Sequence, residues 1–144
     1  MAIRPVNSAK SQFTKFLAGA AIKKGQTIMV DSAEAKPTAE GVATAILLGV
    51  AVEDCADAAT VKIYPIDQVF EFDIYQGGAI DVATDAMMGQ LYDLYVDGAA
   101  GDGSGEGENY IDLNDTTGAS IMLIGYDNVR RVALGKFIEA VRYA

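Results

Sequence analysis

The sequence contains no histidine and no tryptophan, and Cys55 is its only cysteine. Without an imidazole, the chain cannot build a Ser-His-Asp or Cys-His nucleophile system, nor a His-Glu-x-x-His zinc helix. Paired carboxylates remain a possible catalytic arrangement, but the acids are spread through turns and strand ends. The missing tryptophan weakens a sugar-stacking interpretation. We therefore expect a protein that is not an enzyme and has no cofactor.

Long apolar runs are also missing. The longest candidates, residues 43–52 and 119–126, stop within about ten residues, which is too short to span a bilayer as a helix. Residues 1–7 lack the apolar core of a secretory signal. A single cysteine cannot form an internal disulfide and agrees with a reducing compartment. These features predict a protein that is made in the cytoplasm and does not insert into a membrane.

No acidic residue precedes Gln26, whereas nineteen of the twenty acids lie between Asp31 and Asp127. The formal net charge is -9, and basic residues gather at both ends of the chain. An acidic body repels nucleic acid and acidic membranes, while basic ends favour an acidic surface on a protein partner. The basic residues that we expect to contact this partner are Arg4, Lys10, Lys15, Lys23, Lys24, Arg130 and Arg131.

Strand signals dominate the chain. Short segments of alternating or continuous apolar residues are separated by glycine, proline and aspartate turns, which predicts an all-β fold, a small barrel or sandwich. The expected strands are residues 13–17, 27–30, 46–52, 60–64, 69–75, 90–96, 110–113 and 120–126. Residues 129–141 also fit a helical stripe, but residues 136–143 alternate as a strand, and Gly135 together with the β-branched and aromatic residues favours the strand.

A faint internal repeat divides the sequence. Residues 24–31, 47–50 and 60–63 match residues 88–97, 123–126 and 135–138, each set reading as glycine turn, strand, apolar strand with glycine, and closing strand. Either a duplication or chance similarity between β segments explains the match. The predicted units are a β lobe at 13–67 and a barrel-like lobe at 68–144, as one two-lobed domain or two domains.

The first twelve residues are polar and basic. They include Pro5, Lys10 and several Ser, Asn and Gln residues, so we expect an extended arm that packs into no core. A solvated terminus and an arm that pairs its cations with acids on a neighbouring subunit are both compatible with this composition. The second interpretation predicts that deleting residues 1–12 leaves a folded body with weaker attachment to its partner.

The segment 97–109 alternates glycine with oxygen-bearing side chains. Its carboxylates, with one that follows it, are calcium candidates: Asp97, Asp102, Glu106, Glu108 and Asp112. The spacing fits no established calcium loop, so a solvated hairpin loop is the favoured interpretation, and we predict no metal site. The thiol of Cys55 lies between Asp54 and Asp57, whose negative charges disfavour a thiolate. We also expect Asp54, Asp57, Asp81 and Asp85 to cap turns.

The segment 16–30, followed by Leu48-Gly49-Val50-Ala51 and by residues 59–63, resembles the small cement, or decoration, proteins of tailed-phage capsids. That family has a similar phrase of alanine-glycine, isoleucine, spacer, glycine and apolar strand before a Gly-Val-Ala strand. The resemblance covers about residues 13–65. It implies a structural virion protein on the outer surface of the head, bound to the major capsid protein, commonly as a trimer.

Two alternatives remain open at this stage. A non-viral β-barrel binding module for a soluble or cell-surface partner would show a concave apolar pocket. A carboxylate enzyme would need two acids that converge in a cleft, one of them with a raised pKa.

Overall fold

The structure is a computed structural model, and it describes residues 3–6, 14–31, 33–38, 47–96, 109–117 and 119–138. These residues confirm the all-β prediction, since they contain no α-helix and only one 3-10 turn, η2 (Asp85–Met87). The strands are β1 (Ile3–Pro5), β2 (Thr14–Leu17), β3 (Thr27–Asp31), β4 (Glu34–Pro37), β5 (Leu47–Ala51), β6 (Thr60–Pro65), β7 (Phe70–Asp73), β8 (Leu91–Val96), β9 (Asn109–Asp112), β10 (Ile121–Asp127) and β11 (Val132–Phe137).

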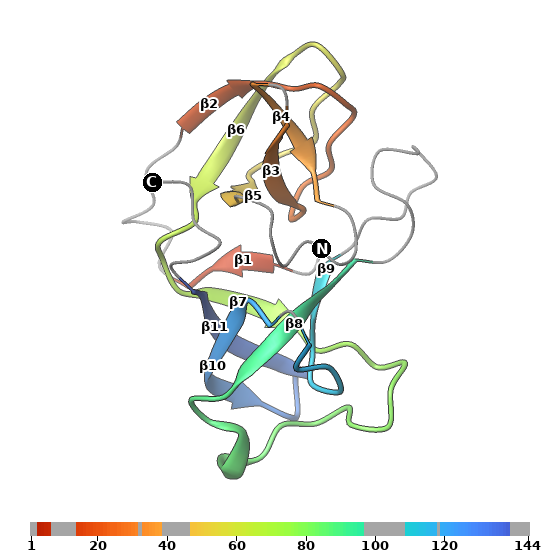
Figure 1. Ribbon diagram of the computed structural model, residues 1–144, viewed down its shortest axis with the longest axis vertical. Helices are drawn as coiled ribbons and strands as arrows, with labels where there is room; N and C mark the ends of the chain where they lie inside the picture. Colours follow the sequence, from red (N-terminus) through yellow and green to blue (C-terminus); the bar gives the residue numbers. More distant parts are fainter. Residues whose placement is uncertain are drawn as a thin grey trace.

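The strands form two curled antiparallel sheets, one above the other in Figure 1. The first has the order β2-β6-β5-β3-β4, and the second has the order β1-β7-β11-β10-β8-β9. If β1 is set aside, the two orders are identical, because β2 corresponds to β7, β3 to β8, β4 to β9, β5 to β10 and β6 to β11. The predicted internal repeat is therefore present as a structural repeat. We call β2–β6 the first repeat and β7–β11 the second repeat.

Matching hydrogen bonds fix the residue correspondence between the repeats. Gly25 and Gly89 both have a positive φ, 84° and 79°, and each is the second residue of the two-residue turn before its strand. The N–H of Gly25 donates to the carbonyl of Ala51 at 3.0 Å, and that of Gly89 donates to the carbonyl of Leu123 at 2.8 Å. A positive φ favours glycine, so both turns need this residue. Ala51 is thus equivalent to Leu123.

Both half-barrels close at the same place. A parallel bridge joins Ala18 to Ala35 in the first repeat, and an equivalent bridge joins Ile74 to Ile111 in the second. The next N–H along the chain donates across the closure in each case, at 2.9 Å from Gly19 to Ala35 and at 3.0 Å from Tyr75 to Ile111. Each repeat therefore curls around its own apolar interior.

The sequence alignment of the repeats was correct for 24–31 with 88–97 but slipped in the later blocks. It matched residues 47–50 with 123–126, whereas the hydrogen bonds make Ala51 of the first repeat equivalent to Leu123 of the second. The glycines misled it, because Gly49 and Gly125 have different roles. A Cβ on Gly49 would lie 1.9 Å from the carbonyl oxygen of Tyr64, while Gly125 follows a bulge in β10. A period-two hydrophobic pattern cannot reveal such a shift, because the pattern looks the same after an even number of residues.

The prediction that the first twelve residues pack into no core is wrong for residues 3–5. Ile3, Arg4 and Pro5 pair antiparallel with Phe72, Glu71 and Phe70 respectively, and the side chain of Ile3 is buried in the core of the second repeat. A short β-branched side chain beside two phenylalanines buries enough apolar area to hold a three-residue strand. Deleting residues 1–12 would therefore remove a strand of the sheet. Residues 7–13 lie outside the described residues.

Two apolar clusters fill the molecule. The smaller one lies inside the first repeat, and the larger one combines the interior of the second repeat with Leu47 and Val50 of β5. Three phenylalanines in the larger cluster, Phe70, Phe72 and Phe137, pack edge to face at 5.5 to 6.4 Å between ring centroids. The two repeats therefore share a core, and the chain passes from one sheet to the other between Pro65 and Phe70.

One contact between a glycine and an isoleucine occurs in both repeats, but the two residues have exchanged strands. Gly49 lies against Ile63 in the first repeat, while the equivalent positions in the second hold Ile121 and Gly135. A Cβ on Gly49 would approach the Cγ2 of Ile63 to 2.6 Å, and a Cβ on Gly135 would approach the Cγ2 of Ile121 to the same distance. Each half-barrel has room for one isoleucine at this contact, and either strand can supply it.

The second repeat has a longer connection between its first two strands, residues 74–90. Two asparagines hold it by imitating a backbone pair. The amide of Asn114 accepts from the N–H of Ile80 at 2.7 Å and donates to its carbonyl at 3.0 Å, and the amide of Asn128 does the same with Ala83, at 2.9 Å in both directions. This connection lies beside the aromatic residues described below.

The helical alternative for residues 129–141 is wrong where the structure describes them. Residues 128–131 form a turn and β11 begins at Val132, before the predicted strand at residues 136–143. Residues 139–144 lie outside the described residues. Within the part of the chain that the structure describes, no helix is long and apolar enough to cross a membrane.

Candidate protein-binding surfaces

The structure places two of the predicted contact cations in an internal ion-pair cluster. Arg4 Nε donates to Glu71 Oε1 at 2.8 Å, and a guanidinium nitrogen of Arg4 lies 3.1 Å from Asp73 Oδ1. Arg130 makes a two-point contact with the same Glu71 carboxylate, at 2.8 and 3.1 Å. Burial raises the pKa of Glu71, but the hydrogen bonds and charges of Arg130 and Arg4 outweigh it and lower that pKa overall. These arginines hold β1 and the turn before β11 against β7.

The other predicted cations are separate from this cluster. Lys15, Lys23 and Lys24 are exposed on the first repeat, and within the described residues no ion pair is recorded for their ammonium groups. Arg131 donates to the side-chain oxygen of Gln76 at 2.6 Å. Lys10 lies outside the described residues. The six predicted cations that the structure describes therefore do not belong to one cluster.

Only one calcium candidate falls within the described residues. Asp112 Oδ1 accepts from the backbone N–H and the side-chain amide of Asn114, at 2.9 and 3.0 Å, so this carboxylate caps a turn. Asp97, Asp102, Glu106 and Glu108 lie outside the described residues. In the described ranges, no group of three or more His, Cys, Asp or Glu side chains is arranged to hold a metal ion.

The environment of Cys55 disfavours the thiolate. Burial raises the pKa of its thiol, and the negative charge of Glu53 raises it further. The sequence argument named Asp54 and Asp57 as the sources of negative charge. Instead Asp54 accepts the backbone N–H of Lys24 at 2.8 Å, a turn-capping contact that agrees with its predicted role.

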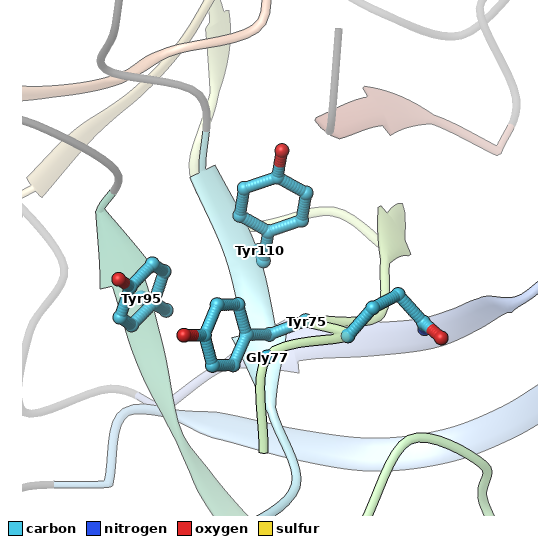
Figure 2. Close-up of a pocket in the computed structure, with 5 residues that line it drawn as sticks. Tyr75, Gly77, Tyr95 and Tyr110 are labelled. Carbon is cyan, nitrogen blue, oxygen red and sulfur yellow. The ribbon is translucent and has the colours of Figure 1, made fainter.

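Three tyrosines of the second repeat line a cleft of about 340 Å³ together with Gln76 and Gly77. Figure 2 shows Tyr75 beside Tyr95, with Tyr110 set apart from the pair. The rings of Tyr75 and Tyr95 stack with centroids 3.9 Å apart, and Tyr110 is tilted, with its centroid 6.1 and 6.3 Å from theirs. A Cβ on Gly77 would lie 2.2 Å from the Tyr75 hydroxyl oxygen, so glycine allows the ring to lie there.

The sequence did not single out these tyrosines, although each belongs to a predicted strand. Comparison of the repeats shows that the fold does not need them. Tyr95 pairs with Tyr110 across β8 and β9, and the equivalent pair in β3 and β4 is Asp31 with Glu34. Tyr75 is equivalent to Gly19. The aromatic cleft is therefore specific to the second repeat.

A second surface lies on the outer face of the second repeat, defined by Leu91, Met122 and Ile124. Leu91 and Met122 pair across β8 and β10, and the three side chains are 36%, 39% and 40% exposed. The equivalents of Leu91 and Met122 in the first repeat are Thr27 and Val50, which are both 0% exposed. The second repeat covers that face of the first repeat, whereas no described residue covers the equivalent face of the second. Large apolar side chains at bare positions are typical of a contact surface.

No protein-family model matches the chain, and no curated protein matches it. The surfaces described above are therefore interpreted from their own chemistry.

Proposed function

We propose that this chain is a non-enzymatic structural protein that binds the outside of an assembled phage head, as capsid decoration proteins do. The observation that supports it best is the outer face of the second repeat. The same sheet face is an interface in the first repeat, and in the second it is apolar and covered by no residue that the structure describes. A protein surface is the partner that such a face suits, because an apolar patch gains most from losing water against another packed surface.

The charge distribution supports a protein partner as well. The chain has a net charge of -9, which disfavours nucleic acid and anionic lipid, and the exposed lysines of the first repeat leave a positive region for an acidic partner. The resemblance of residues 13–65 to capsid cement proteins supports the major capsid protein as that partner and a homotrimer as the bound form. The chain would then act on the outer capsid surface of the virion.

The test is co-sedimentation of the full chain with undecorated phage capsids over a salt series. We expect saturable binding at a fixed ratio to shell subunits. The double variant Leu91→Ser/Met122→Ser should weaken binding about tenfold or more while its unfolding midpoint changes little, since both side chains are exposed in the free protein. Val129→Ser is the matched control, because Val129 is 95% exposed and lies in a turn outside this face.

Absence of binding to every capsid tested would contradict the decoration function. Undiminished binding by the double variant would instead exclude the outer face as the contact. Sedimentation velocity measures the oligomeric state of the free protein. A monomer at high concentration would mean that any trimer forms only on the capsid surface.

The tyrosine cleft favours a second candidate function, a non-viral binding module for a soluble or cell-surface partner. Tyrosines supply flat apolar faces with hydroxyl groups at the rim, an arrangement that suits small or extended ligands. Under this function Tyr95→Ala would abolish binding of the partner, and Leu91→Ser/Met122→Ser would not. Under the decoration function, Leu91→Ser/Met122→Ser should weaken capsid binding and Tyr95→Ala should not.

A further inference from the structure

Among the described residues, the second repeat contains a strand that has no counterpart in the first repeat. β1 comes from the start of the chain and pairs antiparallel with β7, with Ile3, Arg4 and Pro5 opposite Phe72, Glu71 and Phe70. The N–H of Val6 continues the ladder by donating to the carbonyl of Val69 at 3.1 Å. Without β1, β7 would be the edge of its sheet, and its outward N–H and C=O groups would lack these partners.

The strand equivalent to β7 in the first repeat is β2. It pairs with β6 on one side, and among the described residues no strand pairs with its other side. Figure 1 shows β1 alongside β7 in the lower sheet and β2 at the margin of the upper sheet, next to β6. Because both half-barrels close by the same parallel bridge beyond these strands, the closure does not obstruct an added strand. In the second repeat the closure and β1 are present together.

The side chains of β2 show what the missing strand would cover. Phe16 is equivalent to Phe72, which Ile3 helps to bury completely, yet Phe16 is only half-buried. Leu17 is 52% exposed. An apolar residue opposite Phe16 would complete the cluster inside the first repeat in the way that Ile3 completes the larger one.

The charges on β2 reverse those on β7. Arg4 of β1 faces Glu71, and the equivalent of Glu71 in the first repeat is Lys15. Lys15 stands directly opposite Lys62, an arrangement of like charges that destabilises a sheet. The ammonium of Lys62 lies 3.8 Å from Glu53, and since both side chains are about half exposed this pair offsets little of the repulsion. An acidic residue on an added strand would face Lys15 as Arg4 faces Glu71.

We propose that the edge of β2, which no described strand covers, binds an extended segment of a shell subunit by antiparallel strand addition, and that this segment places an apolar residue opposite Phe16 and an acidic residue opposite Lys15. The backbone ladder supplies the attraction, and the pocket at Phe16 and the charge of Lys15 select the side chains. The identity of the partner chain rests on the proposed function. The site itself rests on the comparison of the two repeats.

The first experiment uses two blocked peptides, Ser-Thr-Ile-Glu-Val-Thr-Ser and the same peptide with arginine in place of glutamate, titrated into the ¹⁵N-labelled full chain. We expect the glutamate peptide to shift the amide signals of residues 14–17 and to bind about fivefold more tightly than the arginine peptide. In the variant Lys15→Glu the preference should reverse. If neither peptide shifts these signals, or if the two bind equally, the proposal is wrong and Lys15 only guards the edge against aggregation.

The second experiment separates this site from the proposed function. Lys15→Glu is compared with Lys23→Glu in the capsid co-sedimentation assay, because the two variants change the net charge equally and only Lys15 lies on β2. We expect Lys15→Glu to weaken binding about tenfold and Lys23→Glu, which changes only the overall charge of the lysine surface, to weaken it much less. Equal binding by the two variants would overturn the edge site while the decoration function stands. Selective peptide binding without any capsid binding would support the edge site but overturn the shell subunit as its partner.

Discussion

The side chain of Asn109, at the start of β9, joins the second repeat to Thr27 of β3 in the first. Its Oδ1 accepts the backbone N–H of Thr27 at 2.7 Å and also accepts the Thr27 hydroxyl, while the hydroxyls of Thr27 and Thr38 are hydrogen-bonded to each other. Thr27, Thr38 and Asn109 are all buried. Because apolar contacts between sheets are not directional, this polar connection fixes how the repeats meet.

Asn109→Ala should therefore destabilise the protein, because the buried N–H of Thr27 loses its acceptor. We expect a loss of about 2 kcal/mol in the free energy of unfolding. Asn114→Ala is the matched control, since Asn114 also bonds backbone groups but is exposed, and it should cost less than about 1 kcal/mol. Urea denaturation of the three proteins measures both values, and equal losses would show that the interface does not depend on Asn109.

The ion-pair cluster predicts a pH-dependent stability. Because the pKa of Glu71 is lowered in the folded protein, its contribution is complete above the ordinary glutamate pKa and is lost as the pH falls through the lowered folded value. Glu71→Gln should reduce stability at pH 7 by about 1–2 kcal/mol, and the difference from the parent protein should shrink on acidification toward pH 3.

Glu53→Gln is the control for this effect, because Glu53 is more than half exposed and its pair with Lys62 measures 3.8 Å. Denaturation curves across the acidic range should hardly separate this variant from the parent protein. A constant deficit of Glu71→Gln at every pH would mean that the carboxylate acts through packing alone.

Gly135→Ala should destabilise the second repeat, because the new Cβ would approach Ile121 to 2.6 Å and the ring of Phe72 to 3.0 Å. Overpacking of this kind costs about 1–3 kcal/mol. Ile121→Ala removes the Cγ2 methyl group that the new Cβ would meet, so Gly135→Ala should cost less in that background. A double-mutant cycle from thermal denaturation measures the coupling, and strictly additive effects would contradict a shared contact.

Cys55 should react slowly with iodoacetamide. Its raised pKa leaves little thiolate at pH 8, so the rate should fall below that of an unstructured cysteine peptide and should keep rising with pH beyond the point where the peptide reaches its plateau. Burial is the larger cause of the shift, so Glu53→Gln should increase the rate only slightly. Recovery of the full peptide rate in that variant would assign the shift to charge instead.

Alternation and turn residues predicted most of the strands. Eight of the expected segments became strands at nearly the same bounds, because a half-buried strand needs an apolar side chain at every second position. The two strands that were missed, β1 and β4, are short and contain proline and charged residues. β4 forms a hairpin with β3, whereas the burial of β1 comes from neighbours that are distant in sequence. Ile3, for example, is buried against a strand that begins at Phe70.

The candidate surfaces were less predictable than the strands. Arg4 and Arg130 gave the sequence its basic ends, but Glu71 binds both of them, and only the register of β1 on β7 brings these residues together. The tyrosine cleft could not be predicted from any one segment. Tyr75, Tyr95 and Tyr110 are separated in the sequence and come together only when the half-barrel closes.

The sequence by itself determined the all-β class, most of the strand positions and the absence of imidazole chemistry, because these depend on residue type and on spacing within one segment. The tertiary structure alone decided what covers each face. Thr27 and Leu91 occupy equivalent positions, yet the first is buried and the second exposed, since the second repeat packs on one face and nothing among the described residues packs on the other. A period of two tells which side chains share a face, and burial depends on what the rest of the chain places against it.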